Sequence, residues 1–225
     1  MTKTVKNQIL KNLYNLKSFG YDYHESLDFF SAEVKNFKLP NNLNELKNSV
    51  EHCYLCELSK SRKNVLFAYG NSNSDIMFIS DEPSNSEDEM GVFYTGKSGE
   101  LLSKMIENVL NIKKEDVYLT TLVKCKSSNG LNNSCIDTCN DYLLKQIELV
   151  NPKLIVALGE KVYSYLLKNS FDFAQVRGKD LSFNGISLIT TFSPSFLLRN
   201  PSSKKDAYYD MLKIKNYKEN INWNK

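Results

Sequence analysis

The chain has 225 residues, of which 41% are hydrophobic and 24% charged, so it is long enough to bury one substantial core. No apolar run reaches the ~18 to 20 residues that span a bilayer, and the polar "MTKTVKNQ" start lacks a signal-peptide core. We therefore expect a cytoplasmic protein without a membrane segment. The net charge of +3 permits a polyanionic partner without arguing for one.

The N-terminal part of the chain is predicted to be helical. Apolar residues recur at helical spacing in "TVKNQILKNLYNLKSF", "ESLDFFSAEVKNF" and "NNLNELKNSVEH". The third segment follows Pro40 and begins with asparagines, which are suited to cap a helix. We assign residues 1–40 to an N-terminal helical extension and residues 41–225 to the main domain.

From residue 75 onward, predicted strands alternate with predicted helices. The runs "DIMFIS", "DVYLTTLV", "KLIVALG" and "ISLITTF" are short, apolar and rich in β-branched residues, as strands are. Between them lie the helix-like segments "GELLSKMIENVL", "CIDTCNDYLLKQIELV" and "EKVYSYLLKN". This alternation predicts parallel strands joined by crossover helices, hence an α/β sandwich.

In such a sheet, ligands bind beyond the carboxyl ends of the strands. Two of the loops there, 80–99 and 193–205, are long and rich in polar or turn-forming residues. We expect the first to form the floor of an active site. Pro83 would fix its path, while Gly96 and Gly99 would let the backbone approach a ligand or the next helix.

The five cysteines are unevenly spaced. Cys53 and Cys56 form a C-x-x-C pair, and Cys125, Cys135 and Cys139 lie far downstream. In a chain without an export signal a disulfide framework is not expected, so clustered cysteines indicate metal binding, redox chemistry or chance.

Several segments occur in the order found in one enzyme family. They are "CYLC", "IMFISDEPSNSEDEMGVFYTGKSGELLSKMI", "VYLTTLVKCK", "NPKLIVALGEKV", "RGK" and "TFSPSFLLRNPSSKKDAYYDM". Over residues 50–215 the chain thus resembles the iron-sulfur uracil-DNA glycosylases, family 4 of that superfamily. The resemblance implies a monomeric, three-layer α/β/α sandwich with a mainly parallel four-stranded sheet. It also implies hydrolysis of the bond between uracil, or another deaminated base, and deoxyribose during DNA base excision repair.

The resemblance implies a metal site as well. Its cysteine pattern matches Cys53, Cys56, Cys125 and Cys139, which in the family hold a 4Fe-4S cluster through four thiolates. A four-cysteine site would also suit zinc, and spacing alone does not separate the two metals or exclude plain buried thiols. Cys135 lies one helical turn before Cys139 and is either an alternative ligand or a small buried side chain.

Glycosylase chemistry sets requirements for the site. The base must leave the stack for a pocket, where an aromatic face and hydrogen bonds to its edge identify it. As the bond breaks, positive charge develops on the sugar and negative charge on the departing base. The site therefore needs a carboxylate or activated water near the sugar and donors around the oxygen of the base.

The family's active-site residues carry over with departures. Its Gly-Glu-Ala-Pro-Gly motif reads Ser80 to Ser84 here, which puts Asp81 at the position of the water-orienting glutamate. Tyr94 takes the place of the phenylalanine that stacks on uracil, Thr121 that of an asparagine that reads its edge, and Ser193 that of the histidine of His-Pro-Ser. We assign Asp81 and Ser193 to catalysis. The predicted substrate-binding residues are Glu82, Pro83, Ser84, Tyr94 and Thr121.

Serine at position 193 weakens the expected stabilisation of the negative charge on the departing base, because a serine hydroxyl donates less strongly than a histidine. Loss of one such donor typically raises the activation free energy by ~2.7 to 4 kcal/mol. Neither His24 nor His52 lies in a segment that would compensate. The sequence favours an active glycosylase. The alternatives are a catalytically degenerate DNA-binding relative and a metal-stapled interaction protein.

The segment "SFLLRNPSSKK" combines apolar and basic residues. In the family this loop penetrates the duplex, and an apolar wedge flanked by cations can fill a vacated base site while holding phosphates. We therefore assign Ser195, Leu197, Leu198 and Arg199 to DNA binding. The alternative is a pair of core leucines beside a solvated charge run.

Overall fold

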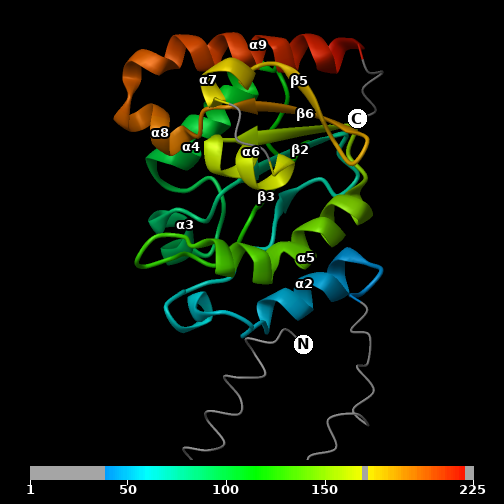
Figure 1. Ribbon diagram of the computed structural model, residues 1–225, viewed down its shortest axis with the longest axis vertical. Helices are drawn as coiled ribbons and strands as arrows, with labels where there is room; N and C mark the ends of the chain where they lie inside the picture. The colour runs from blue at the N-terminus through cyan, green and yellow to red at the C-terminus, as the bar shows by residue number, and fades with distance from the viewer. Residues whose placement is uncertain (1–38, 169–171, 221–225) are drawn as a thin grey trace, which may run out of the picture. The chain divides into compact units, whose positions relative to one another are not determined.

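The computed structural model describes residues 39–168 and 172–220 (Figure 1). The helices predicted within residues 1–38 lie outside the described residues. The first described element is helix α2, Leu43–Glu51, whose N-cap Asn42 accepts a hydrogen bond from the Glu45 amide. The predicted third helix and its asparagine cap are therefore confirmed. The domain boundary at residues 40 and 41 stays a prediction.

One sheet lies at the centre, with strand order β1-β3-β2-β4-β6-β5. The strands are β1 (Tyr69–Gly70), β2 (Ile76–Ser80), β3 (Tyr118–Thr121), β4 (Leu154–Leu158), β5 (Asp180–Phe183) and β6 (Ile186–Thr191). The inner strands β3, β2, β4 and β6 pair in parallel, as the sequence predicted. The predicted total of four strands is wrong, because β1 and β5 add an antiparallel strand at each edge.

The edge strand β5 is joined to β6 by a tight hairpin. Its turn residues Asn184 and Gly185 have φ angles of 50° and 83°, the left-handed conformation that Asn-Gly adopts in two-residue hairpins. At the opposite edge, β1 contains only two residues and pairs with β3. It is too short to show an alternating sequence pattern.

Helices connect and cover the strands. They are α3 (Asn85–Met90), α4 (Gly96–Lys104), α5 (Asn133–Val150), α6 (Glu160–Leu167), α7 (Phe173–Val176), α8 (Pro194–Arg199) and α9 (Lys204–Asn220). A π-helical segment, η2 (Met105–Val109), continues α4, and short 3-10 turns occur at η1 (Glu57–Lys60) and η3 (Pro201–Ser203). The three helices predicted between strands are confirmed. Helices α3 and α8 lie within segments that we expected to be loops.

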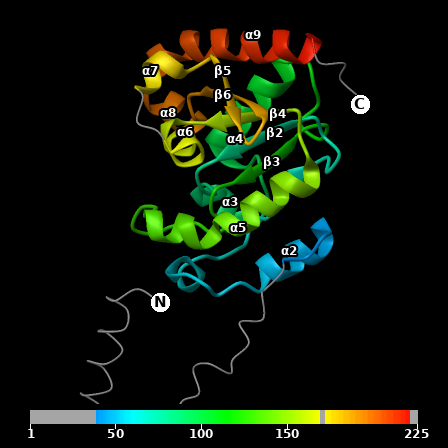
Figure 2. The same ribbon diagram turned by 45° about the vertical axis from the view of Figure 1, so that its right-hand side comes forward.

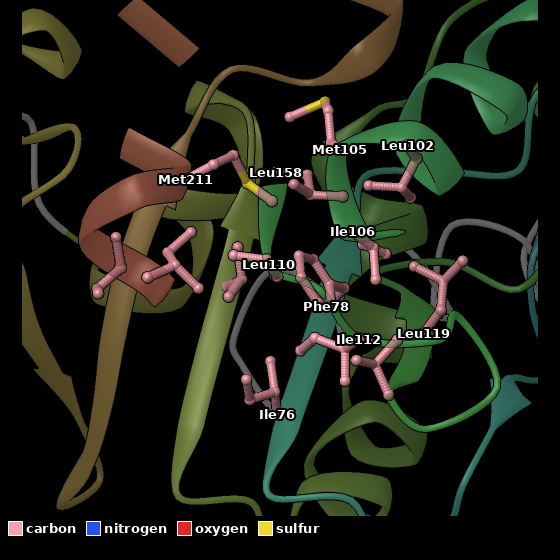
Figure 3. Packing of buried hydrophobic residues seen from close by; sticks show 14 of the residues in the cluster. Ile76, Phe78, Leu102, Met105, Ile106, Leu110, Ile112, Leu119, Leu158 and Met211 are labelled. Atoms are coloured by element: carbon pink, nitrogen blue, oxygen red, sulfur yellow. The ribbon is translucent and has the colours of Figure 1, made fainter. Parts of the chain in front are cut away.

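The helices form a layer on each face of the sheet, as Figures 1 and 2 show for α9 and α5. On one face, side chains of α4, η2 and α9, among them Leu102, Ile106 and Met211, pack on Phe78 and Leu119 of the sheet (Figure 3). On the other face, α5 and α6 pack in a second apolar cluster. The predicted three-layer α/β/α sandwich is therefore confirmed. Within the described part of the chain, none of the helices has the length and apolarity needed to cross a bilayer.

A buried ion pair fixes α9 to the sheet. Asp210 of α9 accepts hydrogen bonds from Arg177 Nη1, with an Oδ1 distance of 2.9 Å, and from the hydroxyl of Thr191 at the end of β6, also at 2.9 Å. The Asp210 side chain is only 1% exposed, whereas Asp206, which pairs with the same guanidinium at 3.1 Å, is 51% exposed. The two acids thus form a matched pair that differs in burial.

We expect Asp210→Ala to lower the free energy of unfolding by about 3 kcal/mol, since it leaves Arg177 and a buried hydroxyl without their acceptor. This is the lower end of the range for a broken buried pair, because burial raises the pKa of Asp210 in spite of Arg177. The control, Asp206→Ala, should cost less than about 1 kcal/mol. Urea unfolding measures both, and equal losses would show that burial does not distinguish the two acids.

Candidate active site and cysteine pocket

An open cleft lies at the carboxyl ends of the parallel strands. Its walls come from the segment after β2, the start of α4, the ends of β3 and β4, and the start of α8. Among the predicted site residues, the cleft is lined by Asp81, Glu82, Pro83, Ser84, Ser193, Ser195 and Arg199. It is also lined by Phe93, Lys97 and Lys126, which the sequence analysis did not assign. The strand order thus brings together segments that lie far apart in the chain.

Asp81 follows β2 directly and lines the cleft. Burial raises its pKa above the ordinary value of 3.8, and neighbouring Glu82 adds to the rise. Backbone N–H groups and Lys161 at the start of α6 act in the opposite direction. A carboxylate with a raised pKa in a cleft is a candidate for acid-base chemistry.

Glu82, by contrast, is held by other groups of the protein. Lys126 Nζ lies 2.6 Å from its Oε1, and the Ser127 amide donates to Oε2 at 2.9 Å. Both carboxylate oxygens therefore have partners at the cleft wall. This geometry favours a structural role for Glu82 over direct contact with a base.

Ser84 begins α3 with a capping box. Its hydroxyl accepts from the Glu87 amide, while Glu87 Oε2 accepts from the Ser84 amide at 2.9 Å. The second carboxylate oxygen of Glu87 accepts from the Tyr94 amide at 3.0 Å. Glu87 thus accepts hydrogen bonds from the backbone at both ends of the segment 84–94.

Tyr94 does not line the cleft. Its ring is buried in the core, where it packs edge-on against Tyr69 with ring centroids 5.2 Å apart. The left-handed backbone at Tyr94, with φ of 62°, accompanies this arrangement, and neighbouring Phe93 lines the cleft instead. Gly99 lies so near that a Cβ there would be 2.3 Å from the Tyr94 carbonyl carbon. Phe93 is as little exposed as Tyr94, each at 8%, and belongs to the same core cluster, so the two rings differ only in that Phe93 lines the cleft.

Thr121 is the last residue of β3 and is fully buried. By strand alternation it shares a face with Leu119, which lines the cleft. Its Oγ1 has no hydrogen-bond partner within the described part of the chain. Thr121 does not itself line the cleft, and its role in reading the base stays a prediction.

Ser193 caps α8. Its Oγ accepts from the Phe196 amide at 3.3 Å and lies 3.1 Å from Ser195 Oγ, while Pro194 occupies the first turn of the helix. The side chain lines the cleft but is already engaged in the cap. A capping serine followed by proline is a sequence signal for a helix at this place.

The two leucines of α8 have different environments. Leu197 is 1% exposed and belongs to the core cluster that includes Met211, whereas Leu198 is 38% exposed. The assignment of Leu197 to DNA contact is corrected to a core position, because consecutive residues of a helix point in different directions. Leu198 and the cleft-lining Arg199 remain available to a ligand.

The four predicted cysteine ligands line one pocket between the C-x-x-C segment, α5 and the segment after β3. These residues are Cys53, Cys56, Cys125 and Cys139. Arg62 Nη1 donates to Cys125 Sγ at 3.1 Å, and the buried Lys124 also lines the pocket. The predicted grouping of these cysteines is therefore present in the fold.

Burial and charge act against each other in this pocket. The pKa of the Cys125 thiol is raised, because burial outweighs the opposing effect of Arg62. The pKa of the Cys139 thiol is raised to about 11, because burial outweighs the opposing effect of Lys124. Burial also lowers the pKa of Lys124 to about 8, although Cys139 and Cys125 favour its charged form. The pocket thus supplies cations beside sulfur atoms that are otherwise poorly solvated, as buried thiolate ligands require.

Cys135 does not line this pocket. Its side chain is buried, and its Sγ lies 3.6 Å from Glu57 Oε1. Burial, together with Cys56 and Glu57, raises the pKa of its thiol to about 11. Cys135 thus neighbours the predicted ligand Cys56 without lining the pocket, and its role stays a prediction.

The sulfur atoms line one pocket without gathering on one point. In the described ranges, no group of three or more His, Cys, Asp or Glu side chains is close enough to hold a metal ion. A zinc ion with sulfur ligands at about 2.3 Å requires such convergence.

Comparison with known proteins identifies the family. The model of the Uracil DNA glycosylase superfamily matches residues 67–213, and the chain belongs to this superfamily. Several similar curated proteins carry the name type-4 uracil-DNA glycosylase, the branch that the motif order predicted. The protein of Saccharolobus solfataricus is 36% identical over 184 residues, 77% of this chain and 85% of the relative. Those of Thermotoga maritima and Sulfurisphaera tokodaii are 35% and 31% identical, covering 69% and 77% of this chain and 82% and 83% of the relatives.

If α8 contacts DNA, Leu198→Ala should weaken binding to a duplex with an abasic site by about tenfold, because an exposed leucine loses its apolar contact. Leu144→Ala on α5 is the matched control, since Leu144 is 37% exposed and Leu198 is 38% exposed. Arg199→Ala should also reduce the slope of log affinity against log salt by about one. Fluorescence anisotropy measures each, and equal affinities of the two leucine variants would remove α8 from the interface.

Proposed function

We propose that the protein is an iron-sulfur uracil-DNA glycosylase that hydrolyses the N-glycosidic bond of uracil, or of another deaminated base, in DNA. One observation carries the proposal. One cleft at the carboxyl ends of the parallel strands is lined by a half-buried carboxylate, Asp81, an aromatic residue, Phe93, and cationic residues such as Lys97 and Arg199. The names of the similar type-4 proteins support it. A cytoplasmic location and a monomeric state stay predictions.

The cleft residues divide the reaction between them. Phe93 offers the extruded base an aromatic face, and Arg199 can hold a phosphate of the strand. Asp81 in its ionised form orients the attacking water and offsets the positive charge that develops on the sugar. The departing base receives hydrogen bonds from donors at the opposite wall, where Gly96, Lys97 and Ser98 begin α4 without a side-chain cap.

The cysteine pocket fits a metal group. Cys53, Cys56, Cys125 and Cys139 would hold a 4Fe-4S cluster, and Arg62 and Lys124 would offset part of the negative charge of the thiolates. Four cysteine thiolates are the ligand set that a 4Fe-4S cluster takes, and they would also suit zinc. When bound, the cluster would cross-link the chain at four points, as structural metal groups do.

A catalytically degenerate DNA-binding relative is the second candidate, and Ser193 favours it. Its hydroxyl is engaged with the Phe196 amide and Ser195, so it offers less to a developing anion than the family's histidine. The third candidate, a metal-stapled interaction protein, predicts no salt-dependent affinity for DNA.

We predict that Asp81→Asn lowers the single-turnover rate of uracil release about 100-fold or more, while DNA binding is retained. In the wild type, the rate should fall as pH drops through the raised pKa of Asp81, because the ionised form is required. Release from uracil-containing oligonucleotides is the measurement. An undiminished rate in Asp81→Asn would show that another acid acts.

The same variant tests the cost of burying the charge. Because the pKa of Asp81 is higher in the folded than in the unfolded chain, its stabilising contribution is complete below the unfolded value of 3.8 and lost as pH rises through the folded pKa. Asp81→Asn should therefore raise the free energy of unfolding at neutral pH.

Ser193→His should raise the rate of uracil release. No release by wild type or Ser193→His, with tight DNA binding, would favour the degenerate relative.

We predict that the purified protein is brown and contains about four irons per chain. Cys53→Ala and Cys139→Ala should lose most of the iron and unfold at lower temperature. Cys135→Ala should keep the iron, because its sulfur lies outside the pocket. Iron analysis and thermal unfolding measure these effects. Anaerobic reconstitution that yields zinc and no iron would contradict the cluster, and equal losses in all three variants would make Cys135 a ligand.

A further inference from the structure

We propose that Glu82, which lines the cleft, and Asp88 of helix α3 are positioning residues that connect the active-site cleft to the cysteine pocket. The inference rests on the proposed function, since it takes the cleft as the catalytic site and the cysteines as ligands of a metal group. It assigns neither acid a contact with the substrate. Each acts through the backbone segments that it holds.

Asp88 fixes helix α3 to the segment that follows η1. The residue is only 7% exposed, and its Oδ1 accepts hydrogen bonds from the amides of Lys63 and Asn64, each at 3.1 Å. The Asn64 side chain in turn donates to the Asp88 carbonyl at 2.6 Å. Such charge-assisted bonds, made in a buried position, hold two backbone segments in one register.

The residues that Asp88 holds lie next to the cysteine pocket. Lys63 directly follows Arg62, which lines that pocket and donates to Cys125 Sγ at 3.1 Å. The connection from α3 to Cys125 thus consists of the Asp88 carboxylate, adjoining backbone and one guanidinium. No apolar contact is needed to complete it.

Glu82 makes a second connection to the same cysteine. Its two carboxylate oxygens accept from Lys126 Nζ at 2.6 Å and from the Ser127 amide at 2.9 Å. These donors directly follow Cys125 in the chain, and the side chains of Glu82 and Lys126 are largely buried. Glu82 thus contacts the residues that follow Cys125. Asp88 contacts Lys63, which follows Arg62, and Arg62 donates to Cys125 Sγ.

The backbone between Glu82 and Asp88 is held by further hydrogen bonds. It contains Ser84, the cap of α3, and Glu87, which also holds the Tyr94 amide beside Phe93. When a metal group fixes the cysteines, the segments after Arg62 and Cys125 are fixed as well. The two acids then transmit this order to the cleft. When the cysteines are released, residues 83–95 should loosen although they bind no metal.

The test uses the full chain reconstituted with iron and sulfide, as wild type, Asp88→Asn, Glu82→Gln and Glu89→Gln. Glu89 is the matched control, because it lies in α3 and pairs with the Lys63 side chain at the exposed surface. Asp88→Asn and Glu82→Gln should keep wild-type iron content. In both, amide hydrogen exchange in residues 83–95 should be at least tenfold faster and single-turnover uracil release at least tenfold slower. Glu89→Gln should change neither.

Iron removal from the wild type, with ferricyanide and a chelator, should speed exchange in residues 83–95 in the same way. Faster exchange confined to residues 53–64 and 125–139 would overturn the proposal. So would unchanged exchange in both acid variants, or loss of iron from them, which would place the acids at the metal site. If Asp88→Asn does not fold, Glu82→Gln decides. A wild type that releases no uracil refutes the proposed activity, while iron content and exchange still decide the connection.

Discussion

Parallel pairing of β3, β2, β4 and β6 is the constraint on which the rest of the molecule depends. Parallel strands cannot be joined by tight turns, so the chain must cross back through a helix between them. All four carboxyl ends therefore lie at the same edge of the sheet. Residues as distant in the chain as Asp81 and Arg199 reach one cleft for this reason. The price is a sheet covered on both faces, which explains the apolar runs of β2 and β4.

Burial opposes the charged form at both functional sites. It raises the pKa of Asp81 in the cleft and those of Cys125 and Cys139 in the cysteine pocket, and it lowers that of Lys124. Selection for stability alone would replace such groups with apolar residues of similar size. Their presence in two separate places, each with nearby charges that partly relieve the cost, is what a site for chemistry and a site for a metal group would each require.

The sequence predicted most of the fold because buried strands and amphipathic helices leave periodic patterns. It did not predict β1, which is too short to show a pattern, or β5, although Asn184-Gly185 is a hairpin signal. Helices α3 and α8 are predicted as loops from the sequence, because each has only six residues, too few to show helical periodicity, and their caps at Ser84 and Ser193 were not recognised. A reading of capping boxes would have found α3.

The site was predicted at the level of segments better than at the level of side chains. Motif order identifies the segment that contains Tyr94, but it does not show that the equally buried neighbour Phe93 is the residue that lines the cleft. Likewise the helix of α8 separates Leu197 from Leu198 by their direction from the axis. In both cases adjacent residues differ in what they contact, which neither composition nor spacing reveals.

The serine at position 193 connects helix stability with catalysis. A short side-chain oxygen at an N-cap reaches the backbone amides of its own helix, as Ser193 does with Phe196. A histidine is a poorer cap but extends further, so its ring could reach a base in the cleft. With serine, α8 is better capped and the cleft loses a long donor. In the proposed reaction, backbone N–H groups at the start of α4 would then be the main donors to a departing base, and Glu87 holds the preceding turn through the Tyr94 amide.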